Sequence, residues 1–251
     1  MNIKVMTFNL RIMTDADGIN RFDKRFWRVV KTIRDELPDL VGFQEATTEM
    51  KRMLEKEISD IYMVVGCGRK CNYRGESVCI GYRKDIFELV NLETYWLSDT
   101  PNVAGSRYEN SDQSQCARLA VCAQLSPEGS NECIFFHNTH LDHKGEQARV
   151  LEIQQVIEKI KSYGGKFILT GDMNDFPDSE CMGLVKSVEG VTDATAELKH
   201  TFHNYGRNDK DCKIDYIYTN ATALKAYTVE DIPVEGVYIS DHYPVCAEIE
   251  I

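Results

Sequence analysis

Four strand-like stretches decide the fold class: VCIGY at residues 78–82, FELVNLETYW at 87–96, RLAVCAQL at 118–125 and CIFFHN at 133–138. Each has the length and composition of a strand, and the segments between them show no convincing helical periodicity. Strands that follow one another directly along the chain pair antiparallel, because a parallel neighbour needs a long crossover connection. The middle of the chain is therefore predicted to be an antiparallel β region.

Helices and strands alternate on both sides of this region. Helical spacing of apolar residues predicts helices over residues 22–37, 48–58 and 146–163. Pro38 stops the first helix, Thr47 or Thr48 caps the second, and Gly164-Gly165 ends the third. The remaining strands are expected at residues 3–10, 40–43, 61–65, 167–170, 213–219, 223–229 and 245–251. We therefore predict an α/β fold, a four-layer αββα sandwich of two mixed β-sheets with helices outside.

The composition excludes several classes of protein. The chain has 251 residues, of which 43% are hydrophobic and 27% charged, so it is neither disordered, collagen-like nor a disulfide mini-scaffold. No repeat or linker divides it, and we expect a single domain over residues 1–251. The net charge of −11 argues against a protein that coats nucleic acid. An anionic substrate is still possible, because a bound divalent cation reverses the local charge.

Nine cysteines are scattered without regular spacing. Cys67 and Cys71 form one C-x-x-x-C pair, but no second pair lies at zinc-ribbon spacing. Reduced thiols that pack as small hydrophobic side chains are the favoured interpretation. No apolar run approaches 18 residues, and the first residues lack a long apolar core. We expect a cytoplasmic protein with no membrane association and no obligate protein partner, although a secretion signal could have been removed.

Polar side chains follow several of the predicted strands at the point where each strand ends. Asn9, Glu45, His140 and the Asp172-Met173-Asn174 segment occupy these positions. One such residue is usually a turn former, but a set that shares one chemistry is harder to dismiss. Catalytic groups in α/β sheets gather at the carboxyl ends of strands. Carboxylate and amide oxygens without a Cys-His cluster select Mg²⁺ or Mn²⁺ over zinc.

Six segments in this order resemble the endonuclease/exonuclease/phosphatase superfamily, which has the DNase-I-like fold. They are Thr7–Arg11, Gln44-Glu45, Thr139–His143, Gly171–Asn174, Asp215 within Ile214–Ile217, and Ser240–His242. Residues 95–101 and 201–203 are similar to a branch of bacterial metal-dependent hydrolases that resembles the poly(A) deadenylases in outline. The resemblance spans residues 3–251 and implies a Mg²⁺- or Mn²⁺-dependent hydrolase of phosphoric esters.

The resemblance also implies roles for individual residues. On the metal side of the site are Glu45, the principal ligand, with Asn9 beside it and Asp241 in support. Asp172 is similar to the carboxylate that activates the attacking water, and Asn174 to the amide that positions water and phosphate. The superfamily supports descriptions with one metal or with two.

Two histidines complete the implied site. His242 is similar to the imidazole that contacts the scissile phosphate, with Asp215 as its partner, and His140 to a second imidazole paired with Glu76. A carboxylate behind an imidazole fixes its tautomer and raises its pKa. A zinc site of three histidines that adds His137 and His143 is disfavoured, because His137 and His140 are an odd number of residues apart on one strand.

We expect in-line attack of an activated water on a nucleotide, a short oligonucleotide or a sugar phosphate. The loops at residues 15–25, 66–76, 99–116 and 175–178 would select among them. A DNA or RNA nuclease is one alternative, and a non-catalytic phospho-ligand-binding module on the same fold is another. Arg118 is an arginine that could contact phosphate, although solvated or ion-paired arginines are commoner.

Overall fold

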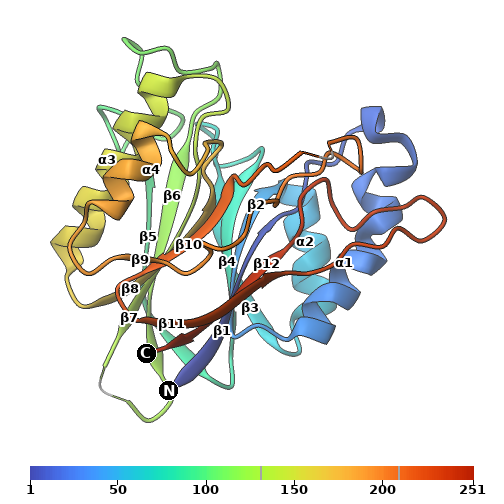
Figure 1. The fold of residues 1–251 in the computed structure, drawn as a ribbon, viewed down its shortest axis with the longest axis horizontal. Helices are drawn as coiled ribbons and strands as arrows, with labels where there is room; N and C mark the ends of the chain where they lie inside the picture. The colour runs from blue at the N-terminus through green and yellow to red at the C-terminus, as the bar shows by residue number, and fades with distance from the viewer. Residues whose placement is uncertain (131, 209) are drawn as a thin grey trace.

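Two six-stranded mixed β-sheets pack face to face, with helices on both outer surfaces (Figure 1). This computed structural model describes residues 1–130, 132–208 and 210–251. The predicted four-layer αββα sandwich is confirmed. The two termini lie together at one end of the sandwich, where the Met1 amino group donates to the Ile251 carbonyl oxygen at 2.9 Å.

The first sheet has the strand order β11-β12-β1-β2-β4-β3. Its strands are β1 (Asn2–Asn9), β2 (Leu40–Ala46), β3 (Tyr62–Gly68), β4 (Ser77–Arg83), β11 (Thr222–Thr228) and β12 (Val245–Glu250). β1 and β2 are parallel, and their helical crossover places both carboxyl ends at the same edge. The other neighbours in this sheet are antiparallel.

The second sheet has the order β5-β6-β7-β8-β10-β9. Its strands are β5 (Phe87–Trp96), β6 (Leu119–Pro127), β7 (Ile134–His140), β8 (Lys166–Asp172), β9 (Thr192–Asp193) and β10 (Asp215–Thr219). β7 and β8 form its parallel pair. The antiparallel region predicted from residues 78–138 is present, but β4 belongs to the first sheet and β5–β7 to the second.

The helices cover the outer faces as their apolar stripes predict. α1 (Phe22–Glu36) and α2 (Thr48–Ile58) pack on the first sheet, and α3 (Glu146–Tyr163) and α4 (Glu180–Lys186) pack on the second (Figure 1). The Thr47 hydroxyl caps α2 by accepting from the Met50 N–H at 3.3 Å. α4 and the short 3-10 helix η1 (Asp15–Asn20) were not predicted, because each is too short to show a periodic pattern.

Polar side chains fix the two sheets against each other inside an otherwise apolar interface. Asn138 on β7 donates to the carbonyl oxygens of Phe43 and Cys79, and its own Oδ1 accepts from Gln44 Nε2 at 2.7 Å. This close approach requires Gly42, because a Cβ there would lie 2.1 Å from Thr170 Oγ1. The network therefore sets how the carboxyl ends of the central strands face each other.

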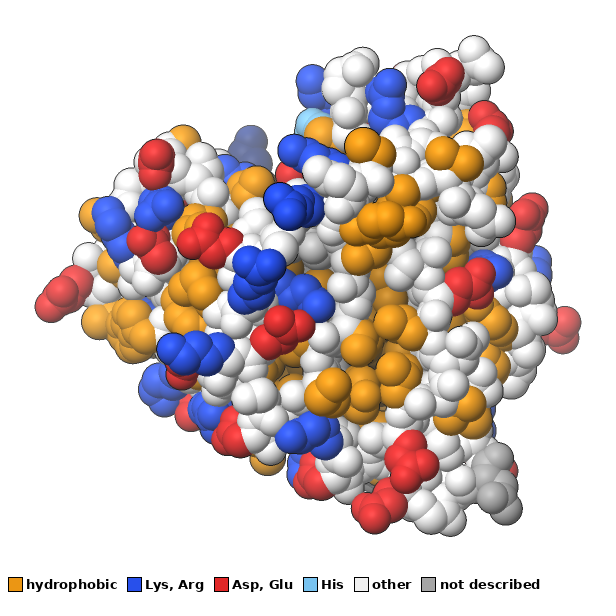
Figure 2. All heavy atoms as spheres, turned by 180° about the vertical axis from the view of Figure 1, so that it is seen from behind, with side chains coloured by type: hydrophobic (Ala, Val, Ile, Leu, Met, Phe, Trp, Pro, Cys, Tyr) orange, Lys and Arg blue, Asp and Glu red, His pale blue; other side chains and the backbone are white. Residues whose placement is uncertain are grey.

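The cysteines and the surface match what the composition predicts, namely free thiols and charged side chains of both signs. All nine cysteines are free thiols. Within the described ranges, no helix has both the length and the apolar character needed to cross a membrane. Seen from behind, acidic and basic side chains both appear across the surface, and hydrophobic side chains gather in the middle of the face (Figure 2).

Candidate active site

The two parallel strand pairs deliver the predicted residues to one pocket. Asn9 lies beside Gln44 at the end of β1 and β2, and His140 lies beside Asp172 at the end of β7 and β8. A cavity of about 450 Å³ opens between these ends. Of the residues assigned from the sequence, those that line it are Glu45, Glu76, His140, Asp172, Asn174, Asp241 and His242. Asn9 and Asp215 lie directly behind them and hydrogen-bond to lining residues.

Glu45 is aimed into the pocket by an irregular backbone. The register of β2 against β4 shifts between Phe43 and Ala46, and Glu45 has a positive φ of 59°. A bulge turns a side chain away from the regular alternation of a strand, and a non-glycine residue with positive φ is strained. One Glu45 oxygen accepts from the Ile12 N–H at 2.7 Å. The surrounding fold therefore holds this carboxylate in an orientation that a regular strand would not give.

Asn9 bridges two carboxylates. Its Nδ2 donates to Asp172 Oδ2 at 2.9 Å and to Glu45 Oε1 at 3.3 Å, while its Oδ1 accepts from the Arg11 N–H at 2.9 Å. In this arrangement the amide oxygen is already engaged and the amide nitrogen faces the acids. Asn9 thus joins the two sheets and orients both carboxylates, and its role as a metal ligand stays a prediction.

Asp172 occupies the centre of the site. Its side chain is almost fully buried, its Oδ1 accepts from the Asn174 N–H at 3.0 Å, and its Oδ2 lies 3.5 Å from His140 Nε2 and 3.7 Å from His242 Nε2. Burial and the nearby Asp215 charge raise the pKa of Asp172 to about 7. A carboxylate with such a pKa is suited to accept a proton near neutral pH.

His242 is a buried cation held by a carboxylate. Its Nδ1 and Asp215 Oδ2 are 2.9 Å apart, and the Asp215 N–H donates to Thr201 Oγ1 at 3.1 Å. Burial by itself lowers the pKa of this histidine, but the charge and hydrogen bond of Asp215 and the charge of Asp172 outweigh burial and raise the pKa to about 10. His242 is therefore charged at neutral pH, with Nε2 directed toward Asp172.

His140 has the opposite electrostatic character. Burial and the charges of Arg118 and Arg69 hold its pKa well below the usual range, so the ring is neutral. The expected partner, Glu76, lies in the same pocket but forms its ion pair with Arg69. Among the residues that the structure describes, Glu76 makes no hydrogen bond to His140, and its carboxylate is bound to Arg69 instead. The expected pairing of Glu76 with His140 was therefore wrong.

The geometry of β7 and the loop after it decides whether His137, Asp142 and His143 face the pocket. His137 points the other way from His140 and packs beneath α3 against Tyr163, so the three-histidine zinc site does not form. Asp142 holds its own loop by accepting from the main-chain N–H groups of Lys144 and Gly145. His143 lines the pocket beside Arg118.

Sequence reasoning did not assign several other lining residues. Arg11, Arg69, Cys116, Ile12, Ile214, Phe202 and Asn204 also border the cavity. Phe202 packs against His242 with a ring separation of 4.8 Å and pairs with it in an isolated β-bridge. The Thr201-Phe202-His203 motif was the available signal for Phe202, but only the fold shows that this loop covers the histidine.

The donor set fits a hard divalent cation. Asp172, Asp215 and His242 each place a ligand-type atom within 4.8 Å of the others, but the protonated ring of His242 has no lone pair for a metal. Glu45 and Asp241, which face the same cavity, are therefore the candidate ligands. Burial raises the pKa of Asp241, and the nearby Glu45 charge raises it further. Crowded, poorly solvated carboxylates of this kind are stabilised by a cation, and carboxylate oxygens suit Mg²⁺ or Mn²⁺.

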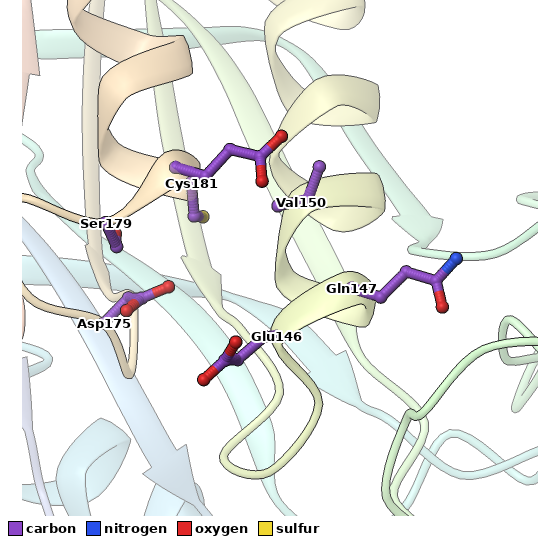
Figure 3. Close-up of a pocket in the computed structure, with 7 residues that line it drawn as sticks. Glu146, Gln147, Val150, Asp175, Ser179 and Cys181 are labelled. Carbon is purple, nitrogen blue, oxygen red and sulfur yellow. The ribbon is translucent and has the colours of Figure 1, made fainter.

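A second hollow lies between the start of α3 and the loop that leads into α4. It measures about 500 Å³, and Glu146 and Asp175 lie on facing sides of it (Figure 3). Asp175 is already paired with Arg149 at 2.9 Å. The described residues that line this hollow include no histidine, whereas His140, His143 and His242 line the strand-end pocket.

Comparison with known proteins identifies the family. The profile of the endonuclease/exonuclease/phosphatase family matches residues 6–242. The chain belongs to this family. A structure of a family protein from Bacteroides vulgatus is 29% identical, covers 100% of this chain and 99% of its own, and has a TM-score of 0.91.

Other solved structures share the fold of this chain. A mannosyl-6-phosphatase from Bacteroides thetaiotaomicron is 25% identical, with 99% and 100% of the two chains covered and a TM-score of 0.89. D. rerio TDP2 in complex with a single-strand DNA product shares the fold at 18% identity, with 100% and 99% covered and a TM-score of 0.80. A comparison with functionally curated proteins finds no match.

Proposed function

We propose that this protein is a divalent-metal-dependent phosphoesterase that hydrolyses a small phosphate ester by in-line attack of water. The observation that carries the proposal is Asp172 Oδ2, which lies between a neutral imidazole at 3.5 Å and a cationic imidazole at 3.7 Å. A base, a fixed positive charge and a neutral imidazole thus meet where a phosphoryl group can sit. Membership of the endonuclease/exonuclease/phosphatase family, and similarity to a mannosyl-6-phosphatase at 25% identity, support the same chemistry.

The metal side of the site would be formed by Glu45 with Asp241. Mg²⁺ or Mn²⁺ held there would polarise a phosphoryl oxygen and neutralise charge on the ester. Glu45 lies near the carboxyl end of β2 and Asp241 lies in the loop before β12, and the positive charge of Arg11 lies 3.7 Å from Asp241 Oδ2. A divalent cation held by the two acids would favour their charged forms.

The other side of the pocket supplies the proton transfer and the charge stabilisation. Asp172 takes the proton of the attacking water, because its raised pKa places it near neutrality. Asn174 donates its side-chain N–H to the Leu141 carbonyl oxygen at 2.9 Å, which leaves its amide oxygen to orient water. The cationic ring of His242 stabilises negative charge that grows on the phosphoryl oxygens in the transition state. His140 can hydrogen-bond the phosphate as a neutral imidazole.

We propose a nucleotide, a short oligonucleotide or a sugar phosphate as the substrate. Ile12, Phe202 and Ile214 give the pocket an apolar wall that can receive the organic part of the ester. The mannosyl-6-phosphatase relative supports the sugar phosphate in this list. The net charge of −11 disfavours a long duplex as the substrate.

The test is a hydrolysis screen with purified protein in Mg²⁺ or Mn²⁺. We expect turnover that EDTA removes and Mg²⁺ restores, and an Asp172→Asn variant slowed by about a hundredfold or more. The matched control is Asp211→Asn, the same change at an exposed carboxylate outside the pocket. Tight binding of phosphate esters with no turnover across the panel would instead support the non-catalytic module.

A further inference from the structure

One end of the pocket is cationic and is not needed for metal binding or for activation of water. Arg118 precedes β6 and is 3% exposed. Its Nη2 lies 3.0 Å from His143 Nδ1, and its Nη1 lies 3.5 Å from the His140 carbonyl oxygen. Its Nε has no hydrogen-bond partner and is 3.6 Å from the nearest carboxylate oxygen, on Asp142. A buried guanidinium with unused donors at the edge of a cavity is suited to bind an anion.

His143 extends this cationic end as a hydrogen-bond donor. A guanidinium can only donate, so the contact with Arg118 requires His143 Nδ1 to be the unprotonated nitrogen. The ring proton of the neutral imidazole is therefore on Nε2. His143 lines the cavity, so this N–H is available to an acceptor in it. The arginine thus fixes the tautomer of the histidine.

Arg69 forms the opposite wall of the same end. It follows β3, pairs with Glu76, and its Nη2 lies 3.2 Å from Cys116 Sγ. The charges of Arg69 and Arg118 both lower the pKa of His140. The two arginines come from different loops and lie near the same imidazole. Both guanidinium groups line the same cavity, and the carboxylates of Glu45 and Glu76 lie beside them.

Arg69, Arg118 and His140 also border a smaller recess beside the main cavity. Glu45, Glu76, Ser77, Val78 and Leu119 form the rest of its wall. A phosphate seated against Arg69 and Arg118 could direct its ester arm into the larger cavity.

We propose that Arg118, Arg69 and His143 form a subsite for a terminal phosphate, so that the enzyme acts on phosphate monoesters in preference to diesters. This inference rests on the proposed phosphoesterase function. A monoester carries about −1.5 to −2 charge at pH 7 and has three non-bridging oxygens. A diester carries one negative charge and has two such oxygens. The extra oxygen and charge match the hydrogen-bond donors of Arg118, Arg69 and His143.

The test compares p-nitrophenyl phosphate with bis-p-nitrophenyl phosphate, two esters with the same leaving group, and measures inhibition by inorganic phosphate. Variants are Arg118→Gln and His143→Gln, and the second keeps the test valid if loss of the buried arginine prevents folding, because His143 is exposed. The matched control is Lys144→Gln, which removes an exposed cation beside the subsite but outside the cavity.

We expect the wild-type kcat/KM to favour the monoester by about 100-fold. Arg118→Gln should weaken inhibition by phosphate about tenfold and raise KM for the monoester more than KM for the diester. His143→Gln should act in the same direction by about threefold, and Lys144→Gln should match the wild type.

Two results would overturn the subsite. One is a wild-type enzyme that cleaves the diester as efficiently as the monoester. The other is inhibition by phosphate that stays within about twofold of wild type in every folded variant. Either result leaves the phosphoesterase function in place, whereas failure to hydrolyse any ester with Mg²⁺ or Mn²⁺ would remove that function itself.

Discussion

Replacing Asp215 by asparagine tests whether a buried carboxylate keeps His242 charged. The two side chains meet at 2.9 Å with almost no solvent exposure. Asparagine keeps the size of the side chain and can still accept from His242 Nδ1, but it removes the negative charge. The histidine then loses the interaction that most strongly opposes the effect of burial, so its pKa should fall.

The size of the fall follows from the strength of the interaction. A hydrogen bond to a charged group contributes about 1.5 to 3 kcal/mol, and one pKa unit corresponds to about 1.4 kcal/mol. The pKa of His242 should therefore drop from about 10 by roughly one to two units. With a drop of about 1.5 units, the charged fraction at pH 9.5 falls from about three quarters to about one tenth.

The assay is kcat as a function of pH between 6 and 10 at saturating Mg²⁺, together with NMR titration of the histidine ring. Because the protonated ring is the active form, activity is lost as pH rises through its pKa. The alkaline limb of the profile should accordingly move to lower pH in Asp215→Asn. Asp211→Asn, an exposed carboxylate four positions earlier, should leave the limb in place.

An unchanged alkaline limb in a folded Asp215→Asn variant would refute the reasoning. Such a result would mean that Asp215 does not keep His242 charged, or that the charge of His242 is not used in the rate-limiting step. The NMR titration separates these two results, since it reports the ring pKa without reference to turnover.

Three further predictions concern the metal, the sheet interface and a buried acid. Burial raises the pKa of Asp172 to about 7, so about half of the molecules carry its proton at pH 7. Binding of Mg²⁺ at pH 7 should therefore release about half a proton, which calorimetry in two buffers measures. The Asp172→Asn variant should abolish this release. Gly42→Ala should lower the free energy of unfolding by about 3 kcal/mol in denaturant titrations, because the new Cβ would lie 2.1 Å from Thr170 Oγ1, whereas Gly183→Ala has open space and should not destabilise. Burial raises the pKa of Glu152 to about 8, so the folded state holds its proton more tightly than the unfolded state and stability is lost as pH rises through 8. The melting temperature of Glu152→Gln should therefore exceed that of the wild type increasingly from pH 6 to pH 9, and a constant difference would contradict this.

The regular elements were largely predictable from local patterns. The strand at residues 87–96 and the helix at residues 146–163 begin and end where the spacing of apolar residues indicates. The short helix α4 has seven residues, and β9 has two, so neither contains enough residues for a period to be seen. Assignment of strands to sheets was also beyond the sequence, because pairing partners lie far apart in the chain.

The identities of the site residues were available from the sequence, but their partners were not. Asn9 hydrogen-bonds to both Glu45 and Asp172, and Glu76 was expected behind His140 but pairs with Arg69. Each of these outcomes depends on which donor lies closest to a carboxylate in the folded structure. The order of the motifs along the chain does not show which donor lies closest to each carboxylate.

The sequence by itself determined the fold class and the residues that carry oxygen ligands and imidazoles, because strand and helix periods and side-chain chemistry are local properties. Only the tertiary structure decided the opposite charges of His140 and His242 and the placement of Arg69 and Arg118 beside His140. A pKa depends on the sum of burial and charges within a few ångströms. Those charges come from loops and strands that are brought together only when the two sheets pack face to face.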